Sequence, residues 1–227
     1  MADADLAIAR LAPETSYKTR AYEALKDAIL KMDIYTTPEP VTLHRVLAEA
    51  AAAGSYATPS GTLAVTASLL FGQIHVLPIV TDYLDAYPTM AARTLFVDRQ
   101  VNIVEEGIDV AVRIGHLSDS GLTAARVGSV RRVVCGSPAY FERHGVPQTP
   151  QDLRDHRIAM STGAWASTEW RFAQDQRVTV HPALMSNTNE AGIAAALAGW
   201  GLTRVLHYQI GPALLEDRLQ VVLADYE

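Results

Sequence analysis

The chain has 227 residues, of which 49% are hydrophobic, and its formal net charge is −6 at pH 7. This composition predicts a folded protein of one or two domains and excludes a uniformly basic, nucleic-acid-binding chain. The single cysteine, Cys135, excludes an intramolecular disulfide and fits a reducing compartment. There is no run of 18 apolar residues and no basic secretory signal at the N-terminus, so a cytoplasmic protein is expected.

The residue pattern over 1–57 predicts a helical N-terminal segment, with an incomplete DNA-binding region, and a linker. Residues 1–14 are expected to be a frayed tail, and an apolar stripe at helical spacing predicts a helix over Thr15–Met32. An alanine-rich helix is expected over Thr42–Ala53. Residues 1–60 hold six lysines or arginines against eight aspartates or glutamates, a net charge of −2. DNA-reading modules usually present a basic surface, so Thr15–Met32 is interpreted as a packing or dimerising helix.

Short apolar runs alternate with helical patterns from residue 61 onward, which is typical of βαβ units and a parallel sheet. The predicted strands are Leu63–Ala67, Thr94–Val97, Ile108–Ile114, Ala124–Val127 and Val130–Gly136. A helix is expected over about Leu70–Tyr87, where Pro78 should kink it or break a turn. A short helix is expected over Gln100–Glu106, with Gly107 as its C-cap.

A second lobe is expected to follow. Pro138 predicts the first turn of a helix that runs to about His144, and Gly199 should end a helix over Asn189–Ala198. The remaining predictions are strands at Arg157–Met160, Trp170–Ala173, Val178–Leu184, Leu202–Leu206 and Leu219–Leu223, and a helix near Gln209–Glu216.

Four motifs recur in order along the chain. GTLAVTA begins at Gly61, EEGIDVAVRIG at Glu105, RRVVCGSPAY at Arg131, and AALAGWGLTRVLHYQIG follows further on. With these motifs, residues 58–227 resemble the effector-binding domain of LysR-type transcriptional regulators. The resemblance implies an α/β, two-lobed, periplasmic-binding-protein-like (type 2) fold that senses a small molecule and regulates transcription.

The resemblance also implies the layout of the lobes. Lobe I is expected over about residues 61–135 and lobe II over about 136–227, with the effector in the cleft between them. In that family a last strand and helix return to the first lobe. The sequence stops at Glu227, where those elements would begin, so the C-terminal return to lobe I is expected to be missing.

A second, shorter resemblance concerns the N-terminal segment. The stretch SYKTRAYEALKDAILKMDIYTTPEPVTL, at about residues 15–42, resembles the start of a GntR-type winged helix domain and stops before a recognition helix. LysR-type regulators bind DNA through a winged helix-turn-helix, so DNA binding by this chain alone is expected to be weak or absent. The family forms dimers and tetramers, and Val76–Tyr83 is the predicted contact face.

Candidate ligand contacts in the first lobe follow the ends of its strands, where open α/β sheets bind ligands. Ser68 precedes a helix N-terminus, which favours anions, although Ser68 can equally serve only as a cap. Phe71 lies in the same turn, Asp98 follows the second strand, and Gly115 and His116 follow the third. His116 is more often a surface histidine than a contact.

The second lobe offers a similar set. Ser161 and Thr162 follow a predicted strand, and Asn187 and Asn189 precede a predicted helix. Opposed helix N-termini with hydroxyl and amide side chains suit a small carboxylate. Arg204 adds a charge or is paired within its sheet.

No enzyme signature is present in the sequence. Histidines and Cys135 lack metal-ligand spacing, and no Walker A, nucleophile elbow or HExxH motif occurs, so no metal, cofactor or catalytic residue is expected. A buried, inert thiol is expected at Cys135. The alternatives are a solute-binding protein of the same fold, a small hydrolase or transferase, and a non-functional rearranged fragment.

Overall fold

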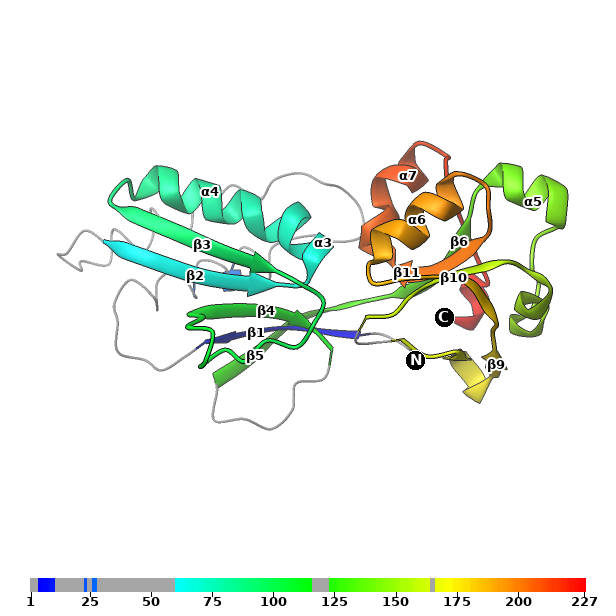
Figure 1. Cartoon of the computed structure of the whole chain (residues 1–227), viewed down its shortest axis with the longest axis horizontal. Helices are drawn as coiled ribbons and strands as arrows, with labels where there is room; N and C mark the ends of the chain where they lie inside the picture. The colour runs from blue at the N-terminus through cyan, green and yellow to red at the C-terminus, as the bar shows by residue number, and fades with distance from the viewer. Residues whose placement is uncertain (1–3, 11–22, 24–25, 28–59, 116–122, 164–165) are drawn as a thin grey trace. The chain divides into compact units, whose positions relative to one another are not determined.

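The computed structural model describes residues 4–10, 23, 26–27, 60–115, 123–163 and 166–227 (Figure 1). The chain forms two compact units: unit 1 comprises Met1–Ala4 and Val130–Glu227, and unit 2 comprises Asp5–Ser129. Each unit contains one five-stranded sheet with helices. The α/β class predicted from the alternating pattern is therefore confirmed. The predicted domain limits, 1–57 and 58–227, stay a prediction.

The sheet of unit 2 has the strand order β3-β2-β4-β1-β5. Its strands are β1 (Ala4–Arg10), β2 (Gly61–Ala67), β3 (Met90–Phe96), β4 (Val110–Ile114) and β5 (Thr123–Val130). Strand β2 runs parallel to both β3 and β4, whereas β1 runs antiparallel to β4. The central strands β2 and β4 are buried along most of their length, as expected for strands covered on both faces.

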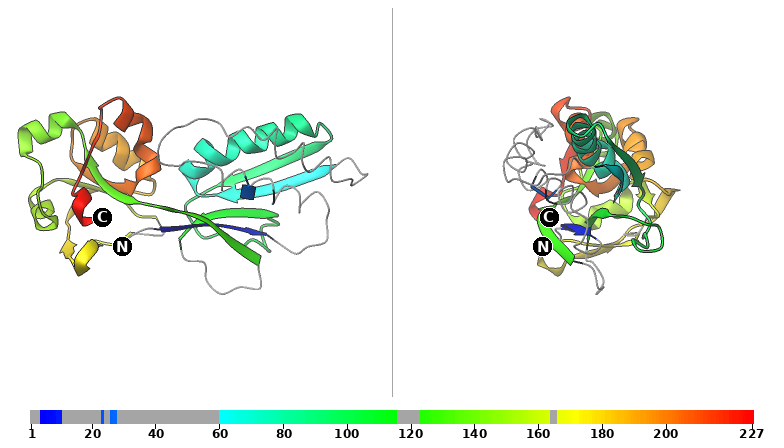
Figure 2. Two further views of the ribbon diagram at one scale, coloured as in Figure 1. Left: turned by 180° about the vertical axis from the view of Figure 1, so that it is seen from behind. Right: turned by 90° about the vertical axis from the view of Figure 1, so that its left-hand side faces the viewer.

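A long helical segment follows β2 and lies along the sheet of unit 2 (Figures 1 and 2). It consists of α3 (Leu69–Phe71), a π-helical turn (Gly72–Val76) and α4 (Leu77–Ala86). Pro78 lacks the N–H that an uninterrupted helix needs, and the π turn accommodates it, so the predicted irregularity at Pro78 is confirmed.

The predicted contact face, Val76–Tyr83, lies partly in the core of unit 2. Val76, Ile79, Val80 and Tyr83 are all buried within unit 2. Leu77 is 40% exposed, and Pro78 beside it is exposed as well. The apolar stripe of Val76–Tyr83 packs within its own unit, and the contact face on the rest of this stretch stays a prediction.

The sheet of unit 1 has the order β10-β7-β11-β6-β12. Its strands are β6 (Arg132–Gly136), β7 (Ile158–Ser161), β10 (Pro182–Ser186), β11 (Leu202–Leu206) and β12 (Gln220–Val222). A separate hairpin pairs β8 (Glu169–Arg171) with β9 (Arg177–Thr179). The helices are α5 (Pro138–His144), α6 (Asn189–Leu197) and α7 (Gly211–Leu215), with short 3₁₀ turns at Pro150–Asp155, Ala173–Asp175, His207–Ile210 and Ala224–Tyr226.

Two groups of apolar side chains form the core of unit 1. One surrounds Tyr140, Leu153 and Trp170, and the other includes Val205 and Ile210. Cys135 belongs to the second group and is completely buried, and burial raises the pKa of its thiol to about 12. The prediction of a buried thiol is confirmed, and its inertness stays a prediction.

Three predicted elements are wrong. Residues 1–14 are not a frayed tail throughout, because β1 occupies Ala4–Arg10 and Ile8 has no exposed surface. Residues 100–106 do not form a helix: residues 103–107 are a turn, and the Asn102 side chain accepts hydrogen bonds from the backbone N–H groups of Val104 and Glu105. The run Val178–Leu184 is divided between β9 and β10.

Most of residues 1–57 lie outside the described residues. The predicted helix at Thr42–Ala53 and the GntR-like stretch fall there, so both stay predictions. Within Thr15–Met32 the structure describes Glu23, Lys26 and Asp27 as helical, and Lys26 forms an ion pair with Glu23.

Candidate functional site

Three predicted residues of unit 2 lie at one edge of its sheet. Ser68 follows β2, Asp98 follows β3 and Gly115 follows β4. The register pairs Ala67, the last residue of β2, with Phe96 of β3 and Val112 of β4. The ends of three neighbouring parallel strands therefore bring these residues together, as predicted for a sheet of this class.

The first helix of unit 2 has its N-terminus occupied by the chain's own carboxylate. Asp98 Oδ1 accepts a hydrogen bond from the backbone N–H of Leu69 at 2.9 Å. The Ser68 side chain makes no capping hydrogen bond. Asp98, rather than Ser68, thus satisfies a free backbone donor of the first turn and complements the helix dipole. The Ser68 hydroxyl therefore does not cap this helix.

Two other predicted residues stand apart from this edge. Phe71 has no exposed surface and packs in the core, with its ring centroid 4.8 Å from that of His75. A fully buried ring is a core residue rather than a ligand contact. His116 lies outside the described residues.

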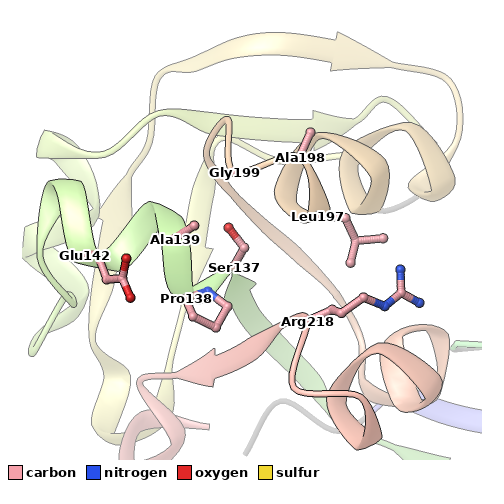
Figure 3. A pocket seen from close by; sticks show the side chains of 8 residues that line it. All are labelled: Ser137, Pro138, Ala139, Glu142, Leu197, Ala198, Gly199 and Arg218. Atoms are coloured by element: carbon pink, nitrogen blue, oxygen red, sulfur yellow. The ribbon is translucent and has the colours of Figure 1, made fainter.

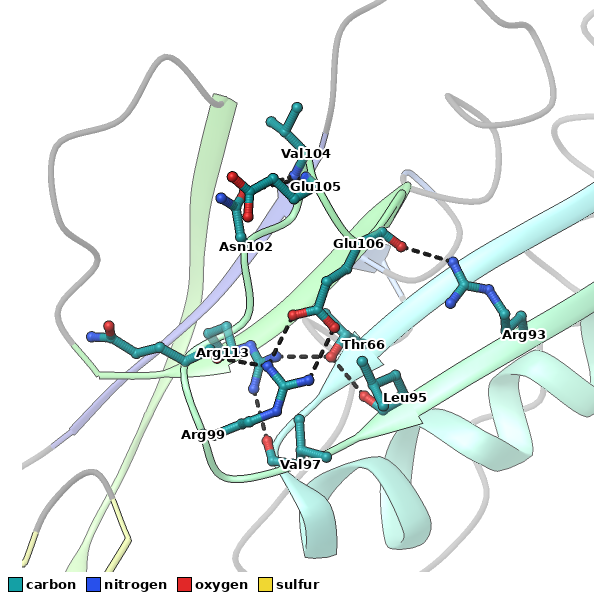
Figure 4. Close-up of polar contacts among 11 residues, drawn as sticks. Thr66, Arg93, Leu95, Val97, Arg99, Asn102, Val104, Glu105, Glu106 and Arg113 are labelled. Atoms are coloured by element: carbon teal, nitrogen blue, oxygen red, sulfur yellow. Dashed lines mark hydrogen bonds and ion pairs between the residues drawn. The ribbon is translucent and has the colours of Figure 1, made fainter.

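Arg113 of β4 is a charged residue at this edge that the sequence argument did not include (Figure 4). Its guanidinium donates to the carbonyl of Val97 at 2.9 Å and to Thr66 Oγ1 at 2.8 Å. Thr66 in turn donates to the carbonyl of Leu95 at 2.6 Å. Burial lowers the pKa of Arg113, and the charge of Asp98 opposes that shift. The sequence feature that could have pointed to Arg113 is an arginine inside the otherwise apolar motif AVRIG.

Two further arginines, Arg93 and Arg99, make hydrogen bonds and an ion pair with the loop between β3 and β4 (Figure 4). Arg99 forms a bidentate ion pair with Glu106, with N–O distances of 2.9 and 3.0 Å. This contact lowers the pKa of Glu106 and raises the pKa of Arg99. Arg93 donates to the carbonyls of Glu106 and Gly107, at 2.9 and 3.2 Å. The pair is largely solvent-exposed, so it fixes loop geometry more than it stabilises the fold.

The equivalent edge of unit 1 gathers the second predicted set. Ser161 ends β7 and is in register with Ser186, which ends β10. The N–H of Thr162 donates to the carbonyl of Ser186 at 2.6 Å, and Ser161 Oγ accepts from the N–H of Gly163 at 3.2 Å. Asn187 follows β10 directly, and Asn189 is the first residue of α6.

The N-terminus of α6 has no side-chain cap. Thr188 is its N-cap residue, and the Thr188 hydroxyl makes no capping hydrogen bond. Glu190 lies in the first turn, and its Oε2 atom is buried without a hydrogen-bond partner. In unit 2, by contrast, Asp98 bonds directly to the N-terminus of the helix that follows β2.

Arg204 of β11 is held inside unit 1. It donates to the carbonyl of Arg171 at 2.6 Å, and its guanidinium lies over the rings of Phe172 and Trp170, at 4.7 and 5.4 Å from their centroids. Burial lowers its pKa to about 9, and the charge of Arg132 adds to this shift. The structure favours the interpretation of Arg204 as an internal packing residue.

One pocket of about 410 Å³ lies in unit 1 (Figure 3). It is formed between the start of α5, the end of α6 and the turn after α7, and it is lined by Ser137, Pro138, Ala139, Glu142, Leu197, Ala198, Gly199 and Arg218. Ser137 caps α5 by accepting from the N–H of Tyr140 at 3.3 Å. None of the predicted ligand residues lines this pocket, which lies at the opposite end of α6 from Asn189. We therefore base no site on it.

No group of three or more potential metal-ligating side chains occurs among the described residues. Among those same residues, no helix has the length and apolar character to span a bilayer.

The sequence of this chain is similar to a known family and to several transcriptional regulators. The family model described as the LysR substrate binding domain matches residues 57–227. The chain is 29% identical over 170 residues to an uncharacterised HTH-type transcriptional regulator of Haemophilus influenzae, a match that covers 74% of this chain and 59% of that protein. It is 27% identical over 174 residues to the HTH-type transcriptional activator TtdR of Escherichia coli, covering 74% and 56%. The chain thus spans less than two thirds of these relatives.

Solved structures give a consistent picture. CrgA, a LysR-type transcriptional regulator from Neisseria meningitidis, superposes with a TM-score of 0.69 at 26% identity, covering 81% of this chain and 65% of that chain. The effector domain of AmpR from Pseudomonas aeruginosa, at 22% identity, is similar in fold, with a TM-score of 0.59 and coverages of 72% and 79%. Such regulatory domains have the periplasmic-binding-protein-like (type 2) fold, so the predicted fold class is confirmed.

Proposed function

Because the chain belongs to the LysR substrate binding domain family, we propose that it is the effector-sensing part of a LysR-type transcriptional regulator. In this role it binds a small molecule, has no catalytic activity, and acts in the cytoplasm. The observation that carries the proposal is the family match over residues 57–227, joined to polar strand ends in both units.

Within unit 1, the proposed ligand contacts are Ser161, Thr162, Asn187 and Asn189. Asn187 and Asn189 flank the N-terminus of α6, which has no side-chain cap bond from Thr188, and Ser161 and Thr162 lie beside the end of the strand that precedes it. A helix N-terminus favours an anionic group through its backbone donors and dipole. A small carboxylate is the proposed ligand class. The buried, unpartnered Glu190 Oε2 lies in the same turn, so amino acids belong among the carboxylates to be tested.

Within unit 2, the proposed contacts are Ser68, Asp98, Gly115 and His116. Asp98 already bonds to the first helix, so an anionic group is disfavoured directly at this N-terminus. Ser68 and Asp98 suit hydroxyl or amino groups of the ligand instead. The unit 1 contacts, taken by themselves, therefore suit a carboxylate, and those of unit 2 suit hydrogen-bonding groups.

The test is a thermal melt of the purified chain against small carboxylates, aromatic acids and amino acids. A ligand at about 100 times its dissociation constant should stabilise the folded protein by roughly 2.7 kcal/mol. A rise in the melting temperature with one compound would support the proposal. A melting temperature that no compound changes would contradict this ligand class.

Two alanine variants test the contacts by calorimetry with the compound that the melt selects. Thr162→Ala and Ser68→Ala should each weaken binding by about tenfold, since each removes a hydrogen bond to a polar ligand. Thr81→Ala is the matched control, because its exposed hydroxyl bonds only to the carbonyl of Pro78 on α4. Unchanged affinity in both site variants would overturn the assignment of these residues.

Two partner proposals complete the function. We propose that the chain forms a homodimer or tetramer, which light scattering of the purified protein tests. DNA binding by this chain alone is proposed to be weak or absent, given the net charge of −2 over residues 1–60. A shifted DNA band at sub-micromolar protein and physiological salt would contradict the latter.

A further inference from the structure

A buried tyrosine of unit 1 joins helix α5 to the start of strand β7. Tyr140 lies in the first turn of α5 and is only 1% exposed. Its hydroxyl oxygen accepts a hydrogen bond from the backbone N–H of Arg157 at 3.1 Å. The same oxygen lies 3.2 Å from Nδ1 of His156. One side chain of α5 therefore contacts both residues that directly precede β7, which begins at Ile158.

The hydrogen bond from Arg157 fixes the direction of the contact with His156. A backbone N–H can only donate, so the Tyr140 oxygen is the acceptor of that bond. The hydroxyl also has one proton of its own, and a buried polar proton needs an acceptor. Among the described residues, His156 Nδ1 is the acceptor within reach of this proton. The arrangement is therefore complete when His156 is neutral, with its ring proton on Nε2.

A protonated His156 does not fit the same arrangement. An imidazolium ring carries a proton on each nitrogen, so Nδ1 becomes a donor. The Tyr140 oxygen then faces two donors, and its own proton stays buried without an acceptor. Breaking either contact relieves this conflict, and each break releases residue 156 or 157 from α5.

The charged groups around His156 act on it in opposite directions. Burial lowers the pKa of His156 from its ordinary value of 6.5, and the charge of His144 on α5 lowers this pKa further. The carboxylates of Asp152 and Asp155, in the 3₁₀ turn before His156, raise the pKa. The carboxylate of Asp152 also accepts two backbone hydrogen bonds at the start of that turn. Burial and His144 outweigh the two carboxylates, so the neutral form of His156 is favoured.

The backbone at Arg157 is closely packed against a second strand of the sheet. Its carbonyl accepts a hydrogen bond from the N–H of Leu202, the first residue of β11, at 2.8 Å. A Cβ added at Gly201 would lie 2.5 Å from the same carbonyl oxygen. Strand β7 itself pairs with both β10 and β11. A displacement of Arg157 therefore affects the pairing of β7 as well as its contact with α5.

We propose that Tyr140, His156 and the Arg157 N–H form a pH-sensitive clamp that ties the start of β7 to α5. The clamp is closed while His156 is neutral and opens when His156 takes up a proton. The stability that neutral His156 contributes is fully present above pH 6.5 and is lost as the pH falls through its lowered pKa. The clamp lies within unit 1 and is independent of the proposed ligand and of the proposed regulatory function.

Nuclear magnetic resonance of the chain labelled with nitrogen-15 tests the clamp. The ring-nitrogen shifts of His156 tell a protonated nitrogen from an unprotonated one, and hydrogen exchange follows the Arg157 amide from pH 8 to pH 4.5. At pH 8, Nδ1 should be unprotonated and Nε2 protonated. Below the midpoint of the His156 titration, the Arg157 amide should exchange about tenfold faster or more, relative to its intrinsic rate.

Three variants separate a titrating clamp from a purely structural contact. Tyr140→Phe keeps the ring and removes the hydroxyl, so the Arg157 amide should lose protection at every pH. His156→Asn keeps an acceptor near the position of Nδ1 but does not titrate in this range, so the protection should no longer depend on pH. His181→Asn is the matched control, because it removes an exposed histidine between β9 and β10 and should leave the pH dependence unchanged.

Three results would overturn the proposal. The first is a proton on His156 Nδ1 at pH 8, since Tyr140 could then not donate to that nitrogen. The second is an Arg157 amide whose exchange, relative to its intrinsic rate, does not change with pH in the original chain. The third is a pH dependence that persists in His156→Asn. None of these measurements needs Tyr140→Phe, so a failure of that variant to fold leaves the test intact.

Discussion

The sheets of units 1 and 2 have the same pattern of parallel and antiparallel strands, but α3 of unit 2 and α6 of unit 1 differ at their N-termini. In unit 2 the Asp98 carboxylate bonds to the N–H of Leu69. In unit 1 the N-terminus of α6 has no side-chain cap. The strand ends of the two sheets are therefore alike in position, while the side chain at the helix N-terminus differs between them. The following predictions test whether the units differ as described.

The largest expected effect concerns Cys135, the only cysteine of the chain, which reports on unit 1. Burial raises its pKa from 9.0 to about 12, so the reactive thiolate should be about 1,000-fold scarcer at pH 8 than in the unfolded chain. The raised pKa contributes stability below pH 9 that is lost as the pH rises through 12. Thiol labelling with and without urea measures this. A native labelling rate within tenfold of the unfolded rate would contradict a closed unit 1.

Two glycines offer a comparison of how rigid the units are. A Cβ at Gly201 of unit 1 would lie 2.5 Å from the carbonyl oxygen of Arg157, whereas one at Gly72 of unit 2 would meet the Phe96 ring. A backbone atom yields less easily than a ring. Gly201→Ala should cost about 3 kcal/mol of unfolding free energy and Gly72→Ala about 1–2 kcal/mol. Urea denaturation of both variants measures the costs, and the reverse order would refute the explanation.

Unit 2 should be the more acid-sensitive unit because of His75. Burial lowers its pKa from 6.5 to about 4, so the unfolded chain binds a proton more readily than the folded one. The contribution of neutral His75 to the free energy of unfolding is therefore fully present above pH 6.5. It should fall by about 2–3 kcal/mol as the pH falls to 4. Burial also lowers the pKa of His156 and His207 in unit 1. His75→Gln should flatten the pH dependence of unit 2 measured by hydrogen exchange, and an unaltered profile would exclude His75 as the cause.

The smallest expected effect is the loss of unfolding free energy on replacing the residues at the two helix N-termini, Asp98 and Thr188. Asp98→Ala should cost about 1 kcal/mol, because it removes the acceptor for Leu69 N–H. Asp98→Asn should cost about half as much, since it keeps an acceptor and loses the charge. Thr188→Ala in unit 1 should cost less than either, because Thr188 makes no capping bond. Equal costs for Asp98→Ala and Thr188→Ala in urea denaturation would remove the contrast between the units.

Elements with local signals were predictable from the sequence. The helix at Pro138–His144 and the strand at Leu202–Leu206 are present with the predicted bounds, because a proline at the first turn and an apolar run between glycine and polar residues mark them. Strand β1 escaped prediction since its partner β4 lies about a hundred residues away, and a short apolar run near a chain start carries no sign of such pairing.

The candidate site was predictable in place but not in chemistry. Strand ends correctly brought Ser68 near Asp98, and Ser161 near Asn187, because register follows from parallel pairing. Asp98 as the group that bonds to the helix N-terminus was not foreseen, because a capping partner about thirty residues away leaves no local pattern. The burial of Phe71 was likewise hidden, since an apolar residue in a turn can face either way.

The π-helical turn at Gly72–Val76 has a consequence for comparing relatives. Such a turn holds one more residue than an α-helical turn over the same path, so it stores a single-residue insertion without displacing the helix on either side. Removing one residue between Gly72 and Val76 should therefore leave α3 and α4 in place, whereas removing one from α4 would rotate its apolar stripe away from the sheet. An alignment gap in this helix belongs at the π turn.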